Sequence, residues 1–406
     1  MDTTAAFESI AGGVTAPAGF LASGVSAGIK ASGKPDVAMI ACATAVPAAA
    51  VFTTNTMAAP PVNVSRAHIA HGAIRATVVN SGNANACTGA QGTADAIAMA
   101  QATASALGCD PHQVIVASTG VIGVPMPMDA VLPGVAAAAA ALHADGGADA
   151  AVAIRTTDTF AKEVAVAFDV DGVTCTIGGM AKGSGMIKPN MATMLACVTT
   201  DAPLTSAACD AALWAAVGRT FNRITIDGDT STNDMCLLMA SGAAGGPAIE
   251  RGTPAFDTVL AAIHHVCAEL SRMIVRDGEG ATKFIEVTVR GAATESDAEA
   301  AAFSIADSPL FKTAIFGSDA NWGRVAMAVG KSSAKVDPNA LEVVFAGITT
   351  CRNGTAVAFD EDAAAAALKL QNVEVVADLH VGDASATVWT CDLTYEYVRI
   401  NGEYRS

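Results

Sequence analysis

A threonine at position 193 is the residue of this chain whose surroundings best suit covalent chemistry. It lies in the segment AKGSGMIKPNMATMLACVTTD, residues 181–201, where a glycine-rich turn with two lysines leads through Pro189 and Asn190 into an apolar run. The run is typical of a buried strand. The residue before the threonine, Ala192, is small, which suits an attack by the hydroxyl on the bond between them.

An N-terminal nucleophile needs a threonine, serine or cysteine that becomes the first residue of a new chain. The Thr193 hydroxyl would attack the Ala192 carbonyl, the acyl group would move from nitrogen to oxygen, and water would release it. The freed α-amine, with an ordinary pKa of about 7.7–8.0, can then act as the base for the same hydroxyl. The alternative is a turn before a buried strand, with Thr193 as an ordinary β-branched residue, and the spacing alone leaves both open.

A second candidate feature is the pair Thr119-Gly120, which ends a strand predicted over residues 113–118. A hydroxyl and an unhindered backbone N–H then stand side by side, and such a pair can stabilise an oxyanion. The same dipeptide also fits a plain turn. A Gly/Asn-rich loop at residues 81–89 follows another predicted strand, and Gly and Asn allow such a loop to turn its backbone amides inward.

Patterns of other site classes are present but incomplete. Residues 24–28 spell the GxSxG elbow of serine hydrolases, yet their flanks predict neither the strand before it nor the helix after it. Residues 323–332 resemble a phosphate-binding loop but have Val325 where the first glycine belongs. Residues 227–238 begin like an EF-hand loop and lack its sixth-position glycine and final glutamate. The histidines and cysteines match no zinc spacing, so we expect no metal site.

Composition narrows the function classes. A chain of 406 residues with 52% hydrophobic and 15% charged residues is globular and long enough for two or three domains. A net charge of −16 without a basic run argues against nucleic acid as a partner. The N-terminal residues lack a basic signal region and the apolar runs are too short for a bilayer, so we expect a cytoplasmic protein with no membrane partner. Ten cysteines without a CxxC pair predict reduced thiols.

Local patterns predict the elements that position these residues. Two alternating segments, 162–168 and 173–177, predict paired strands joined by the hairpin turn Asp171-Gly172. Thr253 and Pro254 begin the clearest helix, because apolar residues recur at helical spacing up to residue 274. Further strands are expected over 37–44, 50–54, 74–80, 223–226 and 284–289, and further helices over 93–107, 126–142 and 205–219.

Three details of these elements are also predicted. Thr93 is expected to cap its helix, and Trp214 is expected on the apolar side of the helix over 205–219. The Pro60-Pro61 pair predicts irregular chain. From about residue 290 acidic helices alternate with strands, so we expect a catalytic core over 1–285 and a smaller C-terminal domain over 286–406.

Several long motifs, in one order along nearly the whole chain, resemble the ornithine acetyltransferase family, also called ArgJ or glutamate N-acetyltransferases. The segment KGSGMIKPNMATML around Thr193 resembles that family's autoprocessing site. The other matching motifs are VNSGNANACTG at 79–89, ASTGVIG at 117–123, TTDT at 156–159, IDGDTSTND at 226–234, DGEG at 277–280, DANWGRV at 319–325 and YVRINGEYRS at 397–406.

The resemblance implies a fold and an activity. The fold is α/β, with two stacked central sheets between helical layers as in the DmpA and ArgJ proteins, and a smaller C-terminal domain. The activity is transfer of acetyl from N2-acetyl-L-ornithine to L-glutamate in arginine biosynthesis. Cleavage between Ala192 and Thr193 would give an α chain, 1–192, and a β chain, 193–406, in an α2β2 assembly. The resemblance implies no cofactor and leaves open whether acetyl-CoA is a second donor that makes the enzyme bifunctional.

The resemblance also assigns site residues. Thr193 would be the nucleophile, and Thr119 and Gly120 would stabilise the oxyanion. The substrate-binding positions would be Thr156, Lys182, Thr193, Glu279, Asn401 and Ser406. These residue types suit amino-acid substrates, because Lys182 can pair with a carboxylate and Glu279 with an ammonium group. An acyl-enzyme that serves donor and acceptor in turn predicts ping-pong kinetics. The final hydroxyl is that of Ser406, where threonine is commoner in the family.

Two rival interpretations remain. An amidase or aminopeptidase of related fold would use the same nucleophile and pass the acyl group to water. A non-catalytic binding protein would remain one uncleaved chain. The acceptor of the acetyl group separates the first rival from an acetyltransferase, and the number of bands on a denaturing gel separates the second.

Overall fold

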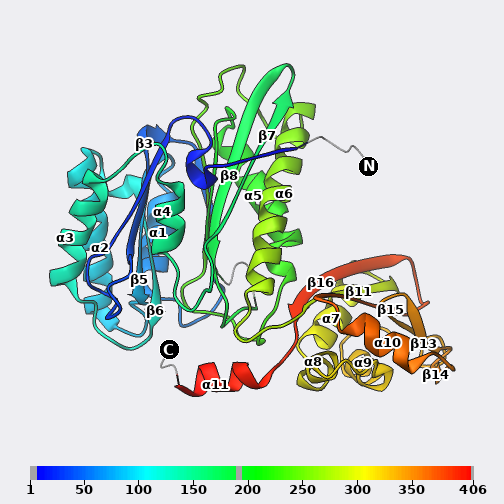
Figure 1. The fold of residues 1–406 in the computed structure, drawn as a ribbon. Coiled ribbons are helices and arrows are strands. Elements are labelled where there is room, and N and C mark those ends of the chain that lie inside the picture. Colours follow the sequence, from blue (N-terminus) through cyan, green and yellow to red (C-terminus); the bar gives the residue numbers. More distant parts are fainter. Residues whose placement is uncertain (1–6, 189–193, 404–406) are drawn as a thin grey trace.

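Two β-sheets stack face to face in the larger part of the molecule (Figure 1). The computed structural model describes residues 7–188 and 194–403. One sheet has the strand order β2 (Phe20–Val25), β3 (Val37–Val46), β5 (Ile74–Asn83), β6 (Val114–Val121). The other has the order β1 (Glu8–Ile10), β7 (Lys162–Val170), β8 (Val173–Lys182), β9 (Leu195–Thr200), β10 (Met235–Ala240), β4 (Ala48–Phe52).

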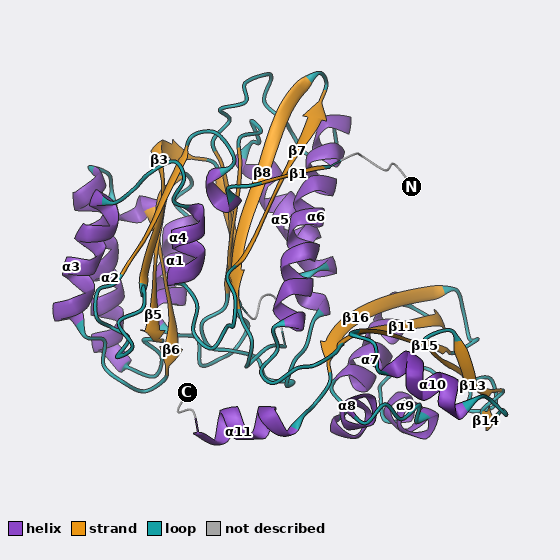
Figure 2. Ribbon diagram, in the orientation of Figure 1, coloured by secondary structure: helices purple, strands orange, loops and turns teal. Residues whose placement is uncertain are grey.

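The hydrophobic core follows these layers. Between the sheets, Ile40 and Ile115 of one pack in the same cluster as Met180 and Leu237 of the other. Helices α2 (Gly89–Leu107) and α3 (Met128–Ala140) cover the outer face of the four-stranded sheet. Helices α5 (Ser206–Arg219) and α6 (Pro254–Arg276) cover the outer face of the six-stranded sheet (Figure 2). The predicted fold of two stacked sheets between helical layers is confirmed.

Two short helices contact both stacked sheets. α1 (Pro60–Ile69) contacts β6 and β4, and α4 (Gly147–Ala153) contacts β2 and β8, so each touches both sheets. Three 3₁₀ turns, η1 (Gly13–Thr15), η2 (Pro111–Gln113) and η3 (Phe221–Arg223), connect longer elements. The predicted hairpin is confirmed as β7 and β8, whose turn residues Asp171 and Gly172 have φ of 52° and 83°, as the tight hairpin turn requires.

Strand β9 has a central place in the six-stranded sheet. It pairs antiparallel with β8, with Lys182 opposite Leu195, and parallel with β10, with Leu195 opposite Met235. The strand thus begins two residues after position 193, later than the apolar run suggested. Residues 189–193, which include the predicted cleavage site Ala192–Thr193, lie outside the described residues, as does Ser406.

The C-terminal part forms a third sheet with its own core. Its strand order is β14 (Thr355–Ala356), β13 (Ile348–Arg352), β12 (Glu342–Phe345), β15 (Asn372–Asp378), β11 (Phe284–Ala292), β16 (Ala384–Cys391). Its helices are α7 (Glu295–Ala306), α8 (Pro309–Phe316), α9 (Trp322–Gly330) and α10 (Glu361–Leu368). The last helix, α11 (Tyr395–Glu403), leaves this sheet and runs back below the larger part (Figure 1).

Several local predictions were wrong. Residues 60–69 form α1, because proline is compatible with the first turn of a helix. Helix α2 begins at Gly89, so Thr93 lies inside it and is not its cap. Residues 223–226 form no strand of the described sheets. Trp214 is 45% exposed, so it does not face the core.

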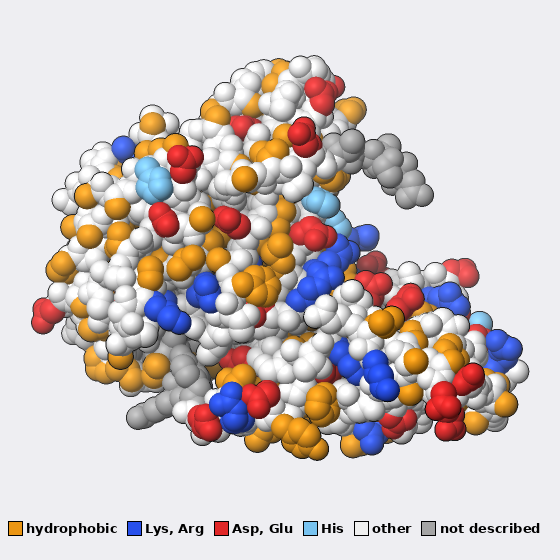
Figure 3. Space-filling model, viewed as in Figure 1, with side chains coloured by type: hydrophobic (Ala, Val, Ile, Leu, Met, Phe, Trp, Pro, Cys, Tyr) orange, Lys and Arg blue, Asp and Glu red, His pale blue; other side chains and the backbone are white. Residues whose placement is uncertain are grey.

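Burial and surface charge fit a globular protein. α6 is long and apolar enough to cross a membrane by length and composition, yet 56% of its most apolar window is buried, as in a core helix. All ten cysteines are free thiols, and all but Cys87 and Cys109 are buried. On the face shown in Figure 3, acidic, basic and neutral side chains are interspersed.

Candidate active site

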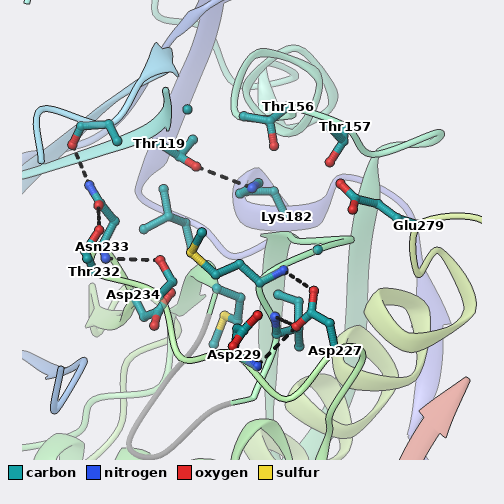
Figure 4. A pocket seen from close by; sticks show the side chains of 18 of the residues that line it. Thr119, Thr156, Thr157, Lys182, Asp227, Asp229, Thr232, Asn233, Asp234 and Glu279 are labelled. Atoms are coloured by element: carbon teal, nitrogen blue, oxygen red, sulfur yellow. Dashed lines mark hydrogen bonds between the residues drawn. The ribbon is translucent and has the colours of Figure 1, made fainter. Parts of the chain in front are cut away.

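A cavity of about 210 Å³ lies where several chain segments meet. Its walls come from the ends of β6 and β8, the start of β9, the loop before β10, the turn after α6, and α11 (Figure 4). The predicted site residues that line it are Thr119, Gly120, Thr156, Lys182, Glu279 and Asn401. Met194, the residue that follows Thr193, also lines it. The structure therefore brings together every predicted site residue that it describes.

The oxyanion candidates lie beside the buried lysine. The Lys182 ammonium donates a hydrogen bond to the Thr119 hydroxyl over 3.3 Å. Gly120 has φ of 134°, and a Cβ added there would lie 2.3 Å from the backbone carbon of Gly82 on the paired strand. A side chain at position 120 is therefore excluded by the backbone of β5, so this position requires glycine.

Burial shapes the electrostatics around Lys182. Only 9% of the residue is exposed, and this desolvation lowers the pKa of its ammonium, although the Asp158 carboxylate opposes the shift. Burial alone would raise the pKa of Asp158, but Lys182 and Lys162 together hold it below its usual range. Desolvation disfavours the charged form of this lysine, and a carboxylate placed beside it would favour that form again, so the cavity suits an anionic group beside Lys182.

A buried ionic network supports three of the predicted substrate-binding positions. The Lys162 ammonium, fully buried, lies 2.7 Å from the Asp158 carboxylate and 2.5 Å from that of Asp277. Asp158 also accepts hydrogen bonds from the backbone N–H of Thr156 at 3.0 Å and of Gly183 at 2.7 Å. Gly183 follows Lys182, and Asp277 lies two residues before Glu279. The network therefore holds the backbone at or beside Thr156, Lys182 and Glu279.

Helix α11 completes the opposite wall. The Asn401 side-chain amide donates to the Glu279 carboxylate over 2.8 Å, and the Tyr397 hydroxyl donates to Asp227 over 3.4 Å. The Glu279 backbone N–H donates to the Ser184 carbonyl over 2.8 Å, which ties this turn to the segment after Lys182. Two acidic side chains thus face the cavity opposite the lysine, an arrangement suited to a ligand with both a carboxylate and an ammonium group.

The loop before β10 contributes polar side chains to the cavity wall. The Asn233 amide donates to the carbonyls of Ala84 and Ser118 over 2.6 and 2.8 Å, and so joins this loop to the residue after β5 and to strand β6. Asp234 is buried, and its Oδ2 has no hydrogen-bond partner in the described part of the chain. Burial raises the pKa of the Asp234 carboxyl well above its usual range. Asp234 thus lines the cavity as a carboxyl whose charged form is disfavoured by burial.

Comparison with known proteins identifies the family. The sequence profile of the ArgJ family matches residues 21–406. The chain belongs to the ArgJ family. It is 55% identical over 401 residues to the arginine biosynthesis bifunctional protein ArgJ of Symbiobacterium thermophilum, which covers 98% of this chain and 100% of that protein. The ArgJ protein of Caldanaerobacter subterraneus subsp. tengcongensis is 49% identical, again over 98% of this chain and 100% of its own.

The fold of this chain is also similar to that of a solved structure from the same family. The crystal structure of the arginine biosynthesis bifunctional protein ArgJ from Bacillus halodurans superposes with a TM-score of 0.51 at 45% sequence identity. It covers 52% of this chain and 100% of its own. The predicted family is confirmed, and with it the prediction of an acetyltransferase of arginine biosynthesis rather than a non-catalytic binding protein.

Several residues of the cavity and its support were not predicted from the sequence of this ArgJ-family chain. Lys162, Asp158, Asp277, Asn233, Asp234 and Tyr397 were given no role, although all but Lys162 lie in motifs shared with the family. Membership in these motifs is the sequence feature that could have marked them as site residues. A motif does not say which charged residue is buried or which partner it contacts, because those contacts join segments far apart in the chain.

Proposed function

We propose that this ArgJ-family chain cleaves itself between Ala192 and Thr193, and that Thr193 then moves acetyl from N2-acetyl-L-ornithine to L-glutamate. The observation that carries the proposal is the convergence of Thr119, Gly120, Thr156, Lys182, Glu279 and Asn401 on one cavity that Met194 also lines. Four of these residues precede the cut and two follow it, so the site is built from both fragments.

The first half-reaction forms an acyl-enzyme. The Thr193 hydroxyl attacks the acetyl carbonyl of N-acetylornithine while its own α-amine takes the proton. The Thr119 hydroxyl and the Gly120 N–H stabilise the oxyanion, and losing one such donor costs on the order of 10²–10³ in rate. The carbon–nitrogen bond then breaks, the leaving amine takes the proton, and ornithine departs from an acetyl ester on Thr193.

The second half-reaction reverses these steps with another amine. The amino group of glutamate attacks the ester carbonyl, Thr193 leaves as a hydroxyl, and N-acetylglutamate departs. Lys182 binds the substrate carboxylate, and Glu279, held by Asn401, binds the ammonium group. Thr156 and Ser406 supply further hydroxyl contacts. The separation of the two half-reactions predicts parallel lines in a double-reciprocal plot when both substrates are varied.

The two fragments remain one body in this proposal. Strands β8 and β9, on opposite sides of the cut, pair residue by residue from Ile177 with Thr200 to Lys182 with Leu195. The Bacillus halodurans chain covers all of its own length but about half of this one, which supports a break near the middle. We further propose a catalytic core over 1–285, a C-terminal domain over 286–406, an α2β2 assembly and a cytoplasmic location.

The test follows acetyl transfer directly. Purified protein is incubated with N-acetylornithine and glutamate, and in a second arm with acetyl-CoA and glutamate, because the relatives are named bifunctional. N-acetylglutamate in the first arm supports the proposal, and product in the second arm adds acetyl-CoA as a donor. Acetate without N-acetylglutamate in the first arm would favour an amidase. Equal activity of Thr193→Ala would remove Thr193 as the nucleophile.

A further inference from the structure

The segment just before the proposed cut, residues 185–188, is fastened by one loop from the other side of the cut. The Asp227 carboxylate accepts two consecutive backbone hydrogen bonds, from Met186 N–H at 2.6 Å and from Ile187 N–H at 2.9 Å. Met186 has φ of 56°, a left-handed conformation that costs energy for a residue with a side chain. The paired hydrogen bonds to Asp227 hold the backbone in that conformation.

Two more contacts extend this attachment toward the cut. The Ile226 N–H donates to the Ile187 carbonyl over 2.7 Å, and the Thr230 hydroxyl donates to the Lys188 carbonyl over 2.9 Å. Ile187 is buried in the core beneath α5 and α6. The main chain is therefore held on both its N–H and its carbonyl side up to Lys188, the last described residue before the cut.

An ion pair adds an anchor from the C-terminal part. The Lys188 ammonium lies 2.7 Å from the Asp307 carboxylate, which follows α7, and above the Phe303 ring at 5.8 Å. The other carboxylate oxygen of Asp307 accepts from the Thr225 hydroxyl over 2.6 Å. Asp307 therefore fixes both Lys188 and the start of the loop that holds it.

The chain is also fixed on the far side of the cut. The Met235 N–H donates to the Met194 carbonyl over 2.9 Å, and strand β9 starts at the next residue. Met194 and Leu195 are both buried. The hydrogen bonds and the ion pair named here, which anchor the two described ends that flank residues 189–193, all come from residues after the cut.

We propose that Asp227, Thr230 and Asp307 form a processing clamp, whose task is to position the chain for self-cleavage rather than to transfer acetyl. The inference rests on the proposed function. In the step it serves, the Thr193 hydroxyl adds to the Ala192 carbonyl, the peptide carbon–nitrogen bond breaks as the ester forms, and the proton moves from hydroxyl to amine. Water then hydrolyses the ester to a carboxylate on Ala192 and the free hydroxyl of Thr193. The rate of such an intramolecular step depends on how well the approach geometry is held.

The test measures cleavage itself. The full chain of 40.5 kDa is made by rapid cell-free synthesis, and its conversion to two fragments is followed on denaturing gels. Thr230→Val, which keeps the shape and removes the donor, is expected to slow conversion about three- to tenfold. Thr230→Ser keeps the donor and is expected to cleave within about twofold of the wild-type rate. Lys188→Gln is expected to slow conversion about two- to threefold, because its ion pair is partly exposed.

Matched controls separate positioning from loss of structure. Arg290→Gln removes an ion pair of the same 2.7 Å length with Asp378, remote from the cut, and is expected to cleave at the wild-type rate. Once fully processed, Lys188→Gln is expected to keep wild-type kcat and KM for acetyl transfer, since Lys188 does not line the cavity. A structural defect would lower kcat as well and would slow both Lys188→Gln and Arg290→Gln.

The outcomes distinguish this inference from the function on which it rests. A wild-type chain that never cleaves would overturn the proposed function and the processing clamp with it. A wild-type chain that cleaves and transfers acetyl, with Thr230→Val and Lys188→Gln cleaving equally fast, would overturn the processing clamp alone. Slow cleavage with normal acetyl transfer by the processed variants supports it.

Discussion

Asp234 is a cavity residue whose ionisation is disturbed by burial. Its carboxyl is buried, its Oδ2 lacks a hydrogen-bond partner in the part of the chain that the structure describes, and burial raises its pKa well above the usual range. In the unfolded chain the same group has a pKa of about 3.9. Between these two pKa values the folded state binds a proton that the unfolded state has lost, so this group's contribution to stability falls as pH rises.

Asp234→Asn is therefore expected to stabilise the protein at neutral pH. The amide keeps the shape of the neutral carboxyl and has no proton to take up, so the free energy of unfolding at pH 7 rises by about 1–3 kcal/mol. The difference shrinks as pH falls toward 4, where the carboxyl is protonated in both states. Urea unfolding at several pH values measures it, and Asp229→Asn, an exposed carboxylate of the same loop, is the control. A stabilisation that does not depend on pH would contradict the assignment.

Some single site residues could be predicted from the sequence and others could not. Thr119, Lys182 and Glu279 were found because each stands in a motif shared with the family, and each lines the cavity. The roles of Asp234 and Lys162 depend on burial, which the sequence does not display for a charged residue. A lysine four residues after an aspartate is usually a solvated pair, and here both side chains are fully buried.

At the scale of elements, the buried network joins β7 to the two turns that carry substrate-binding positions. Lys162 at the start of β7 meets Asp158 in the preceding turn and Asp277 after α6. Removing one partner of a buried ion pair leaves an uncompensated charge, which costs about 3–5 kcal/mol. Lys162→Met is therefore expected to lower the free energy of unfolding by that amount.

Denaturant unfolding measures this loss of stability. A double variant tests whether the loss comes from the buried charges left without a partner. Lys162→Met with Asp277→Asn removes one of the stranded charges and is expected to recover part of the stability. Lys335→Met, which changes an exposed lysine, is expected to stay within about 0.5 kcal/mol of wild type. If the double variant were no more stable than Lys162→Met, the network would not act as an ion pair.

Helices and strands could be predicted from the sequence where neighbouring residues specify them. The β7–β8 hairpin has alternating strands and an Asp-Gly turn, and α6 has a capping threonine, a first-turn proline and a long apolar face. The prolines of α1 predict irregular chain, because Pro60-Pro61 gives the same local signal at a helix start as in a turn. Residues 223–226 have a strand-like sequence but join no sheet: Ile224 forms an isolated bridge to Trp389, and the Ile226 N–H donates to the Ile187 carbonyl.

At the scale of the whole molecule, the proposed cut falls between two central, adjacent strands. β8 would belong to one fragment and β9 to the other, and their pairing, the core between the sheets and the core beneath α6 all contain residues from both. Hydrophobic burial shared in this way makes the fragments one cooperative unit. The two stacked sheets therefore need residues of both fragments, whereas the C-terminal sheet and its core lie wholly in the second fragment.

The two stacked sheets of the mature protein are accordingly expected to unfold together, in one transition that involves both fragments. Fragments 1–192 and 193–406 should co-elute in size-exclusion chromatography at every urea concentration below the unfolding midpoint and separate only above it. Thr193→Ala, which stays one chain, should show the same m-value, since the same surface is exposed on unfolding. Its midpoint should fall less with dilution than that of the cleaved protein, because unfolding of the cleaved protein releases more separate chains. Separation of the fragments below the midpoint would show that β8 and β9 do not hold the two halves together.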